Sequence, residues 1–93
     1  MLPLKVAILD WAMDHKDQGF KVEDILEAMK PLYGSERQCN LKRIESYCQD
    51  YMMNGFFVAK EVSITEEGEA DVTYKVTQYA IDRGNRFIPE RKK

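Results

Sequence analysis

The sequence is poor in the residue types that build catalytic, metal-binding and disulfide-rich sites. It contains one histidine and two cysteines, and these have none of the spacings of a metal-binding motif. Glycine-rich phosphate loops and the serine elbow of hydrolases are also missing. The neighbouring carboxylates Glu66 and Glu67 fall on an expected turn that is too well solvated for acid–base catalysis. We therefore expect that the protein is not an enzyme and holds no metal or cofactor.

Long apolar runs and an excess of either charge are missing as well. No stretch approaches the roughly 18 apolar residues of a membrane span, because Lys5 and Asp10 interrupt the apolar start of the chain. The 14 Lys and Arg residues face 16 Asp and Glu residues, so the net charge is −2 and any basic surface must be local. Cys39 and Cys48 are too few for a disulfide scaffold. These absences predict a soluble, cytoplasmic protein.

The composition of the 93-residue chain is typical of one small globular domain. Hydrophobic residues make up 44% of it and aromatic residues 11%, with only three prolines and five glycines. Apolar residues at helical spacing predict a first helix after Pro3, whose apolar stripe is wide enough to be covered on two sides. A short extended stretch at residues 20–22 follows. Glu23 and Asp24 then mark the start of a second helix, which is expected to end or kink just before Pro31.

A third helix begins at one of two capping signals. Ser35 opens a capping box, and Asn40 offers a second cap about one turn later. The helix is expected to end at Asn54, because Gly55 suits a left-handed residue after a helix. Its core-facing residues are Leu41, Ile44, Cys48 and Tyr51, with Tyr47 at the margin.

Beyond residue 56 the apolar period becomes two, which predicts a β-hairpin. A turn centred near Gly68 places Ile64 opposite Val72 and Val62 opposite Tyr74. The hairpin is followed by a brief fourth helix over residues 78–83, which Thr77 caps and Gly84 closes.

Two local patterns accompany this order of elements. Ile44, Tyr47, Cys48 and Tyr51, followed by Gly55 and Phe56, form the first, and the segment 74–80, Tyr-Lys-Val-Thr-Gln-Tyr-Ala, forms the second. The first resembles the recognition helix of winged helix-turn-helix regulators. The second is similar to the closure of the second wing strand in MarR-type and PadR-type members, although Ala80 stands where glycine is usual. The resemblance implies an α+β winged helix-turn-helix, with a three-helix core, a two-stranded wing and a short C-terminal helix. Residues 1–84 form this domain and residues 85–93 a basic tail.

The exposed side of the third helix is a candidate for reading double-stranded DNA. Arginine and lysine pair with guanine edges or phosphates, and asparagine and glutamine with adenine, while a helix start offers amides to phosphate. The resemblance implies that this helix enters the major groove. The same residues also suit an ordinary solvated surface. The candidates on and before the third helix are Arg37, Gln38, Asn40, Lys42, Arg43 and Ser46, and those in the tail are Arg86, Arg91, Lys92 and Lys93.

The wing departs from the pattern of DNA-binding members. Residues 61–71 contain five acidic residues and no basic one, and such a tip repels phosphate. Residues 83–93 have a net charge of +4 and compensate. The leading hypothesis is therefore a transcription regulator that binds DNA through its third helix and tail. The alternative is a winged-helix module, or a subunit of a larger assembly, that binds another protein at the acidic wing.

Two further expectations concern partners. The wide apolar arc of the first helix predicts a homodimer through this helix and residues 78–88, since palindromic operators need paired reading heads. A ligand sensor is a third hypothesis for the function, with an aromatic cleft formed by Trp11, Tyr47, Tyr51 and Tyr79.

Overall fold

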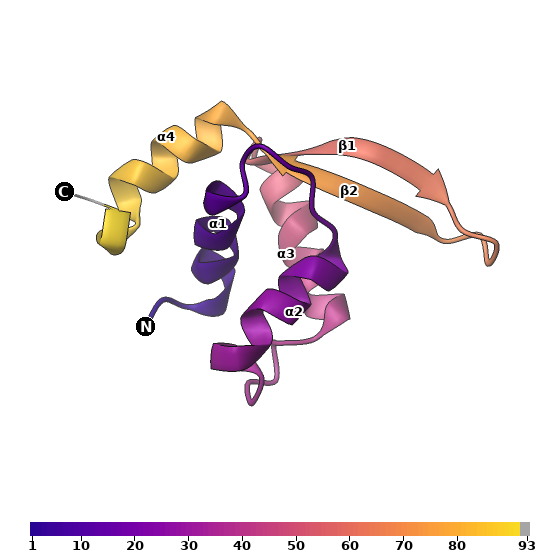
Figure 1. Ribbon diagram of the computed structural model, residues 1–93, viewed down its shortest axis with the longest axis horizontal. Helices are drawn as coiled ribbons and strands as arrows, with labels where there is room; N and C mark the ends of the chain where they lie inside the picture. The colour runs from indigo at the N-terminus through magenta and orange to yellow at the C-terminus, as the bar shows by residue number, and fades with distance from the viewer. Residues whose placement is uncertain (92–93) are drawn as a thin grey trace.

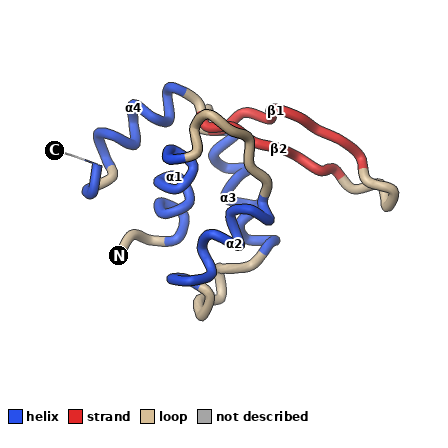
Figure 2. Tube along the Cα trace, in the orientation of Figure 1, coloured by secondary structure: helices blue, strands red, loops and turns tan. Residues whose placement is uncertain are grey.

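The computed structural model describes residues 1–91, apart from the side chain of Glu90, and these form an α+β structure. Figures 1 and 2 show α1, α2 and α3 packed together, with the antiparallel hairpin projecting to one side and α4 on the other. This arrangement is compatible with a winged-helix layout. No helix of the described chain is long and apolar enough to span a membrane. The elements are α1 (Leu4–Asp14), α2 (Val22–Tyr33), α3 (Leu41–Met53), β1 (Phe57–Ile64), β2 (Ala70–Val76), α4 (Gln78–Phe87) and a 3-10 helix, η1 (Pro89–Arg91).

Helix α1 lies in the core because apolar side chains occupy much of its circumference. Ile8 and Ala12 have no exposed surface, and Leu4, Leu9 and Met13 are also buried. Helix α2 packs against α1, and so does α4. The wide apolar stripe predicted for this helix is therefore covered within one chain. Each large side chain buried in this way contributes roughly 1.5–3 kcal/mol of hydrophobic stabilisation.

Helix α2 continues through Pro31 to Tyr33, so the end predicted before the proline is wrong. Proline removes only its own N–H from the helical hydrogen bonds, and the amide of Gly34 still donates to the Lys30 carbonyl at 3.0 Å. The last turn also positions Tyr33, which is buried and donates its hydroxyl proton to the Leu2 carbonyl. Burial of this ring outweighs the tendency of proline to end a helix.

Of the two predicted starts of α3, the structure uses Asn40. Its side-chain oxygen accepts a hydrogen bond from the Arg43 amide at 2.9 Å, which satisfies one of the free amides of the first turn. At the other end Gly55 has a φ of 81°, which confirms the predicted left-handed residue. Ile44, Cys48 and Tyr51 are buried, as predicted. The prediction that Leu41 faces the core is wrong, because this first residue of α3 is 46% exposed.

The predicted hairpin is confirmed, but the predicted register is wrong. Val62 lies opposite Val72, and Ile64 opposite Ala70, whereas Tyr74 pairs with a residue nearer the base of the hairpin. The turn is tighter than expected. Because Ile64 pairs with Ala70, the turn consists of residues 65–69, whereas the predicted pairing of Ile64 with Val72 around residue 68 leaves a longer turn. The observed pairs nevertheless keep the apolar residues of both strands on one face.

The turn and a bulge explain this register. The Thr65 amide donates to the Glu69 carbonyl at 2.8 Å, and Gly68 supplies the positive φ of 82° that the turn needs. Nearer the base, a bulge at Lys60 shifts the pairing by one more residue. The hairpin is joined to the body by an isolated bridge between residues 20 and 74, within the predicted extended stretch.

Helix α4 continues past the predicted end at Arg83 to Phe87, because Gly84 does not close it. Gly84 is instead buried where α4 packs against α1, and the helix needs a residue without a side chain there. The predicted N-cap is confirmed, since Thr77 accepts a hydrogen bond from the Ala80 amide at 3.1 Å. Beyond the helix, Ile88 is buried, so the predicted tail contributes a side chain to the core at this point.

Candidate nucleic-acid interface

Six of the predicted DNA-binding residues lie together at the N-terminal end of α3. All six side chains are exposed, and they occupy the turn after α2 and the first turns of α3, at the bottom of the view in Figure 1. Lys42 and Ser46 are separated by one helical turn and share one side of α3. We call this group the α3 cluster; its members are Arg37, Gln38, Asn40, Lys42, Arg43 and Ser46.

Asn40 shapes the α3 cluster from within. Its side-chain nitrogen donates to the Arg37 carbonyl at 2.6 Å, and its side-chain oxygen accepts from the Arg43 amide at 2.9 Å. Both polar ends of the amide are therefore occupied inside the protein. Asn40 fixes the turn and the start of the helix, whereas its neighbours present the exposed charges.

The cations of the α3 cluster have no acidic partner. Arg37, Lys42 and Arg43 form no ion pair with any carboxylate that the structure describes. Further along α3, Asp50 is neutralised by Lys5, whose ammonium lies 3.2 Å from its carboxylate. The start of α3 also carries the partial positive charge of its helix dipole. Glu36 and Glu45 lie in the same segment, so three basic and two acidic residues give residues 35–46 a net charge of +1 on a chain with a net charge of −2.

The structure does not bring the predicted tail residues to the α3 cluster. Figure 1 shows α4 at the top of the view and the turn before α3 at the bottom. Arg86 is exposed on α4. Arg91 instead binds α1, donating hydrogen bonds to the carboxylates of Asp10 and Asp14 and to the Asp10 carbonyl. Lys92 and Lys93 lie outside the described residues.

The guanidinium of Arg91 is therefore committed to structure. Partial burial acts to lower its pKa, but the hydrogen bonds with Asp14 and Asp10 outweigh burial and raise that pKa above its ordinary value. A phosphate would have to displace two carboxylates to bind this side chain. Of the predicted tail cations that the structure describes, Arg86 alone is exposed without an ion pair.

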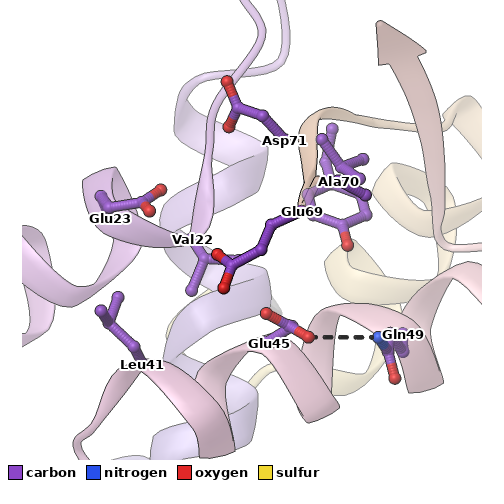
Figure 3. Close-up of a pocket in the computed structure, with 10 residues that line it drawn as sticks. Val22, Glu23, Leu41, Glu45, Gln49, Glu69, Ala70 and Asp71 are labelled. Carbon is purple, nitrogen blue, oxygen red and sulfur yellow. Dashed lines mark hydrogen bonds between the residues drawn. The ribbon is translucent and has the colours of Figure 1, made fainter. Parts of the chain in front are cut away.

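A second surface, the acidic groove, lies beside the α3 cluster and was not predicted. It separates α3 and the start of α2 from the inner face of the hairpin, encloses about 260 Å³, and is shown in Figure 3. Four carboxylates but no lysine or arginine line it. The lining residues are Val22, Glu23, Leu41, Glu45, Gln49, Glu69, Ala70, Asp71, Val72 and Tyr74.

One carboxylate of the acidic groove anchors the hairpin. The Lys21 ammonium lies 2.7 Å from the Asp71 carboxylate and joins the N-cap of α2 to β2. The hydrogen bond and the charge of Asp71 together raise the pKa of Lys21. The remaining carboxylates, Glu23, Glu45 and Glu69, form no ion pair within the described chain. Both partners of the Lys21–Asp71 pair are partly exposed to solvent, so its effect is to orient the hairpin more than to stabilise it.

The four aromatic residues of the ligand-sensor hypothesis do not form one cleft. Tyr51 is buried and donates its hydroxyl proton to the Lys5 carbonyl, and burial raises its pKa. Tyr79 is half-exposed on α4, where it packs edge-on against Phe56. Trp11 stacks on His15 at the far end of α1. Tyr47 lies beside Tyr51, since the Lys5 ammonium is within 5.6 Å of both ring centroids, and Phe56 separates Tyr51 from Tyr79. The rings are therefore packed on other side chains.

The acidic groove left two signals in the sequence. The first is that apolar residues alternate along the whole hairpin, including the outer half, which projects beyond the helices in Figure 1. The second is that Glu45 follows Leu41 by one helical turn on α3. Neither signal identifies the groove without knowledge of how the hairpin docks. No protein-family model matches the sequence, and no curated protein matches it. The assignment of a function therefore rests on the residues of these two surfaces.

Proposed function

We propose that the protein is a winged-helix regulator of transcription in the cytoplasm, which binds double-stranded DNA through the α3 cluster. The observation that carries the proposal is the grouping of three exposed cations at the N-terminal end of α3, none of which has an acidic partner among the described side chains. Lys42 and Arg43 reach guanine edges or phosphates, and Arg37 reaches a phosphate. Gln38 and Ser46 supply neutral hydrogen-bonding groups beside them.

In this arrangement the hairpin does not bind phosphate. The carboxylates at its tip and in the acidic groove oppose a polyanion, so the affinity must come from the start of α3. Arg91 contributes to the fold and not to the DNA surface, because Asp10 and Asp14 hold it.

A homodimer would supply the two reading heads of a palindromic site. Since α4 covers α1 in the same chain, we place the contact on the outer side of α4. Phe87 is 68% exposed and Tyr79 50%, and the guanidinium of Arg83 lies over both rings. This stripe falls within the predicted segment, residues 78–88.

The test is fluorescence anisotropy of labelled random duplex DNA across a range of salt concentrations. We expect saturable binding that weakens steeply with salt, and the Lys42→Ala/Arg43→Ala variant should lower the salt slope by about one for each phosphate that the variant no longer binds. Lys16→Ala/Lys60→Ala removes the same charge from exposed positions outside α3 and outside the dimer contact on α4, and serves as the control. Equal weakening in both variants, or no binding by the parent at low salt, would contradict the proposal.

A further inference from the structure

The inner face of the hairpin carries apolar side chains that the described chain leaves exposed toward the tip and covers only in part at Val72. Val62 is 59% exposed and Ile64 67% exposed, and they lie directly opposite Val72 and Ala70. Opposed residues share a face, so all four continue the face on which Tyr74 is buried in the core. We call these residues the apolar strip: Val62, Ile64, Ala70 and Val72.

The apolar strip is continuous with the acidic groove. Ala70 and Val72 belong to both, and Leu41, which is 46% exposed, lines the other side of the groove on α3. The combined surface thus has apolar side chains along the hairpin and at the start of α3, beside the carboxylates that line the groove. Exposed apolar surface that is contiguous and rimmed by polar groups is typical of an interaction site.

The size of the groove favours side chains of a protein over a small molecule. At about 260 Å³ it is smaller than the roughly 300–1,000 Å³ of most small-molecule sites. It is also open toward the exposed strip. A chain segment that inserts one or two aliphatic side chains and lies along the hairpin fits this shape better.

The charge of the rim selects the partner. Glu23, Glu45 and Glu69 have no cationic partner in the described chain, and Figure 3 shows the carboxylates of Glu45 and Glu69 in the space between α3 and β2. These groups repel phosphate, which argues against DNA at this surface. Arg91, the last described residue of the basic tail, is held by Asp10 and Asp14 of its own chain. Binding of a second copy through its α3 cluster is an alternative outcome that the experiment below separates from binding of a basic peptide.

We propose that the acidic groove and the apolar strip together bind a basic segment of a partner protein, one that presents aliphatic side chains between lysine or arginine residues. The aliphatic groups pack on the strip and on Leu41, and the cations pair with Glu23, Glu45 and Glu69. The proposal does not depend on DNA binding, because it uses different residues and a partner of opposite charge.

The experiment is an NMR titration of the ¹⁵N-labelled protein with a short peptide of alternating lysine and leucine. We expect saturable shifts of the Leu41, Val62, Ile64 and Ala70 amides and binding that weakens with salt. Glu45→Gln/Glu69→Gln should weaken binding about three- to tenfold. Glu66→Gln/Glu67→Gln makes the same charge change at the tip, outside the groove, and should change it less than about twofold.

A second variant tests the apolar part. Val62→Thr/Ile64→Thr keeps β-branched side chains at exposed strand positions, so the hairpin should still form, and the peptide should bind about three- to tenfold more weakly. Shifts spread over other surfaces, or an equal weakening in both glutamine variants, would show non-specific attraction and overturn the proposal. It is also overturned if duplex DNA, or an increase in protein concentration alone, produces the shifts at these four amides and the peptide does not.

Discussion

The backbone of Gly84 packs directly against the thioether of Met13. A β-carbon built on Gly84 would lie 2.2 Å from Met13 Sδ and 2.7 Å from its methyl carbon. Helix α4 therefore approaches α1 as closely as a missing side chain permits, and Met13 fills the space that a larger residue at position 84 would occupy. This contact explains how glycine is accommodated inside α4.

The contact between Gly84 and Met13 predicts that Gly84→Ala destabilises the parent protein but stabilises a Met13→Ala variant. With Met13 present, Gly84→Ala gains roughly 1 kcal/mol of helix propensity but loses roughly 1–3 kcal/mol to overpacking, so we expect a net loss of about 1 kcal/mol. In the Met13→Ala background the added methyl group enters free space, and Gly84→Ala should stabilise by about 1 kcal/mol. Urea denaturation of the four proteins measures both values. Equal effects in the two backgrounds would contradict the contact.

Stability should fall at alkaline pH because of buried groups in α3. Burial, helped by the nearby charge of Glu45, raises the pKa of Cys48 from 9.0 to about 12. The pKa of Cys48 is higher in the folded protein than in the unfolded chain. The neutral thiol therefore contributes its full stabilisation of the fold below pH 9, and this stabilisation is lost as the pH rises toward 12. At pH 10 the free energy of unfolding should be lower by about 1.4 kcal/mol than at pH 7 because of Cys48.

Urea midpoints at pH 7 and pH 10 test this expectation. Cys48→Ala is less stable at both values because it leaves a cavity, but it should lose about 1.4 kcal/mol less than the parent between them. Tyr51, whose pKa burial also raises, remains in the variant and accounts for a further loss above pH 10. An identical pH dependence in parent and variant would show that Cys48 does not contribute.

Local signals in the sequence were sufficient for features that depend on neighbouring residues. Asn40 was one of two predicted caps, and Gly55 and Thr77 occupy the predicted end of α3 and start of α4. Features that depend on packing were missed. Pro31 stays inside α2 because Tyr33, the last residue of the helix, is buried.

The two candidate sites also differ in whether neighbouring residues or long-range packing determines them. The exposed face of α3 could be predicted from helical periodicity, because only the core side of the helix had to be identified. The acidic groove could not, since it joins Glu23, Glu45 and Glu69 from three separate elements. The pairing of Arg91 with Asp10 and Asp14 also escaped prediction, because nothing local marks two residues so far apart in the sequence as neighbours.

Arg91 should affect stability and not DNA binding. Its guanidinium joins the end of the described chain to α1, so Arg91→Ala should lower the free energy of unfolding by about 1 kcal/mol. At low salt the variant should bind duplex DNA as the parent does, with an unchanged salt slope. The parallel variant Arg86→Ala removes an exposed cation from the same region and should leave stability within about 0.5 kcal/mol. Weaker DNA binding by the Arg91 variant, but not by the Arg86 variant, would show that Arg91 binds DNA and would contradict its purely structural role.

The exposed side of α4 that carries Tyr79, Arg83 and Phe87 predicts a dimer, which one substitution should disrupt. Sedimentation at tens of micromolar should show a species of twice the chain mass, and Phe87→Lys should convert it to the monomer by placing a charge in the contact. Leu32→Lys is a matched control, because Leu32 on α2 is 70% exposed and Phe87 68%. A monomeric parent protein would contradict the dimer, and an equal effect of both variants would move the contact away from α4.

The acidic tip of the hairpin should weaken DNA binding and not specify it. Five carboxylates lie within residues 61–71, and duplex DNA carries one charge per about 1.7 Å of its axis. Glu66→Gln/Glu67→Gln/Glu69→Gln removes three of these charges, all at exposed positions. We expect affinity for random duplex DNA at low salt to rise about three- to tenfold, with less change at high salt because repulsion is screened.

The matched control, Asp17→Asn/Glu27→Gln/Asp82→Asn, removes three exposed carboxylates from the helices and their connections. It makes the same change in net charge, so it measures the effect of the global charge alone. A larger gain for the tip variant shows that the tip approaches the phosphates when α3 is bound, whereas equal gains place it outside their reach. A loss of DNA binding in the tip variant alone would mean that the carboxylates contact DNA bases or a bound cation, and it would overturn the assignment of affinity to the α3 cluster.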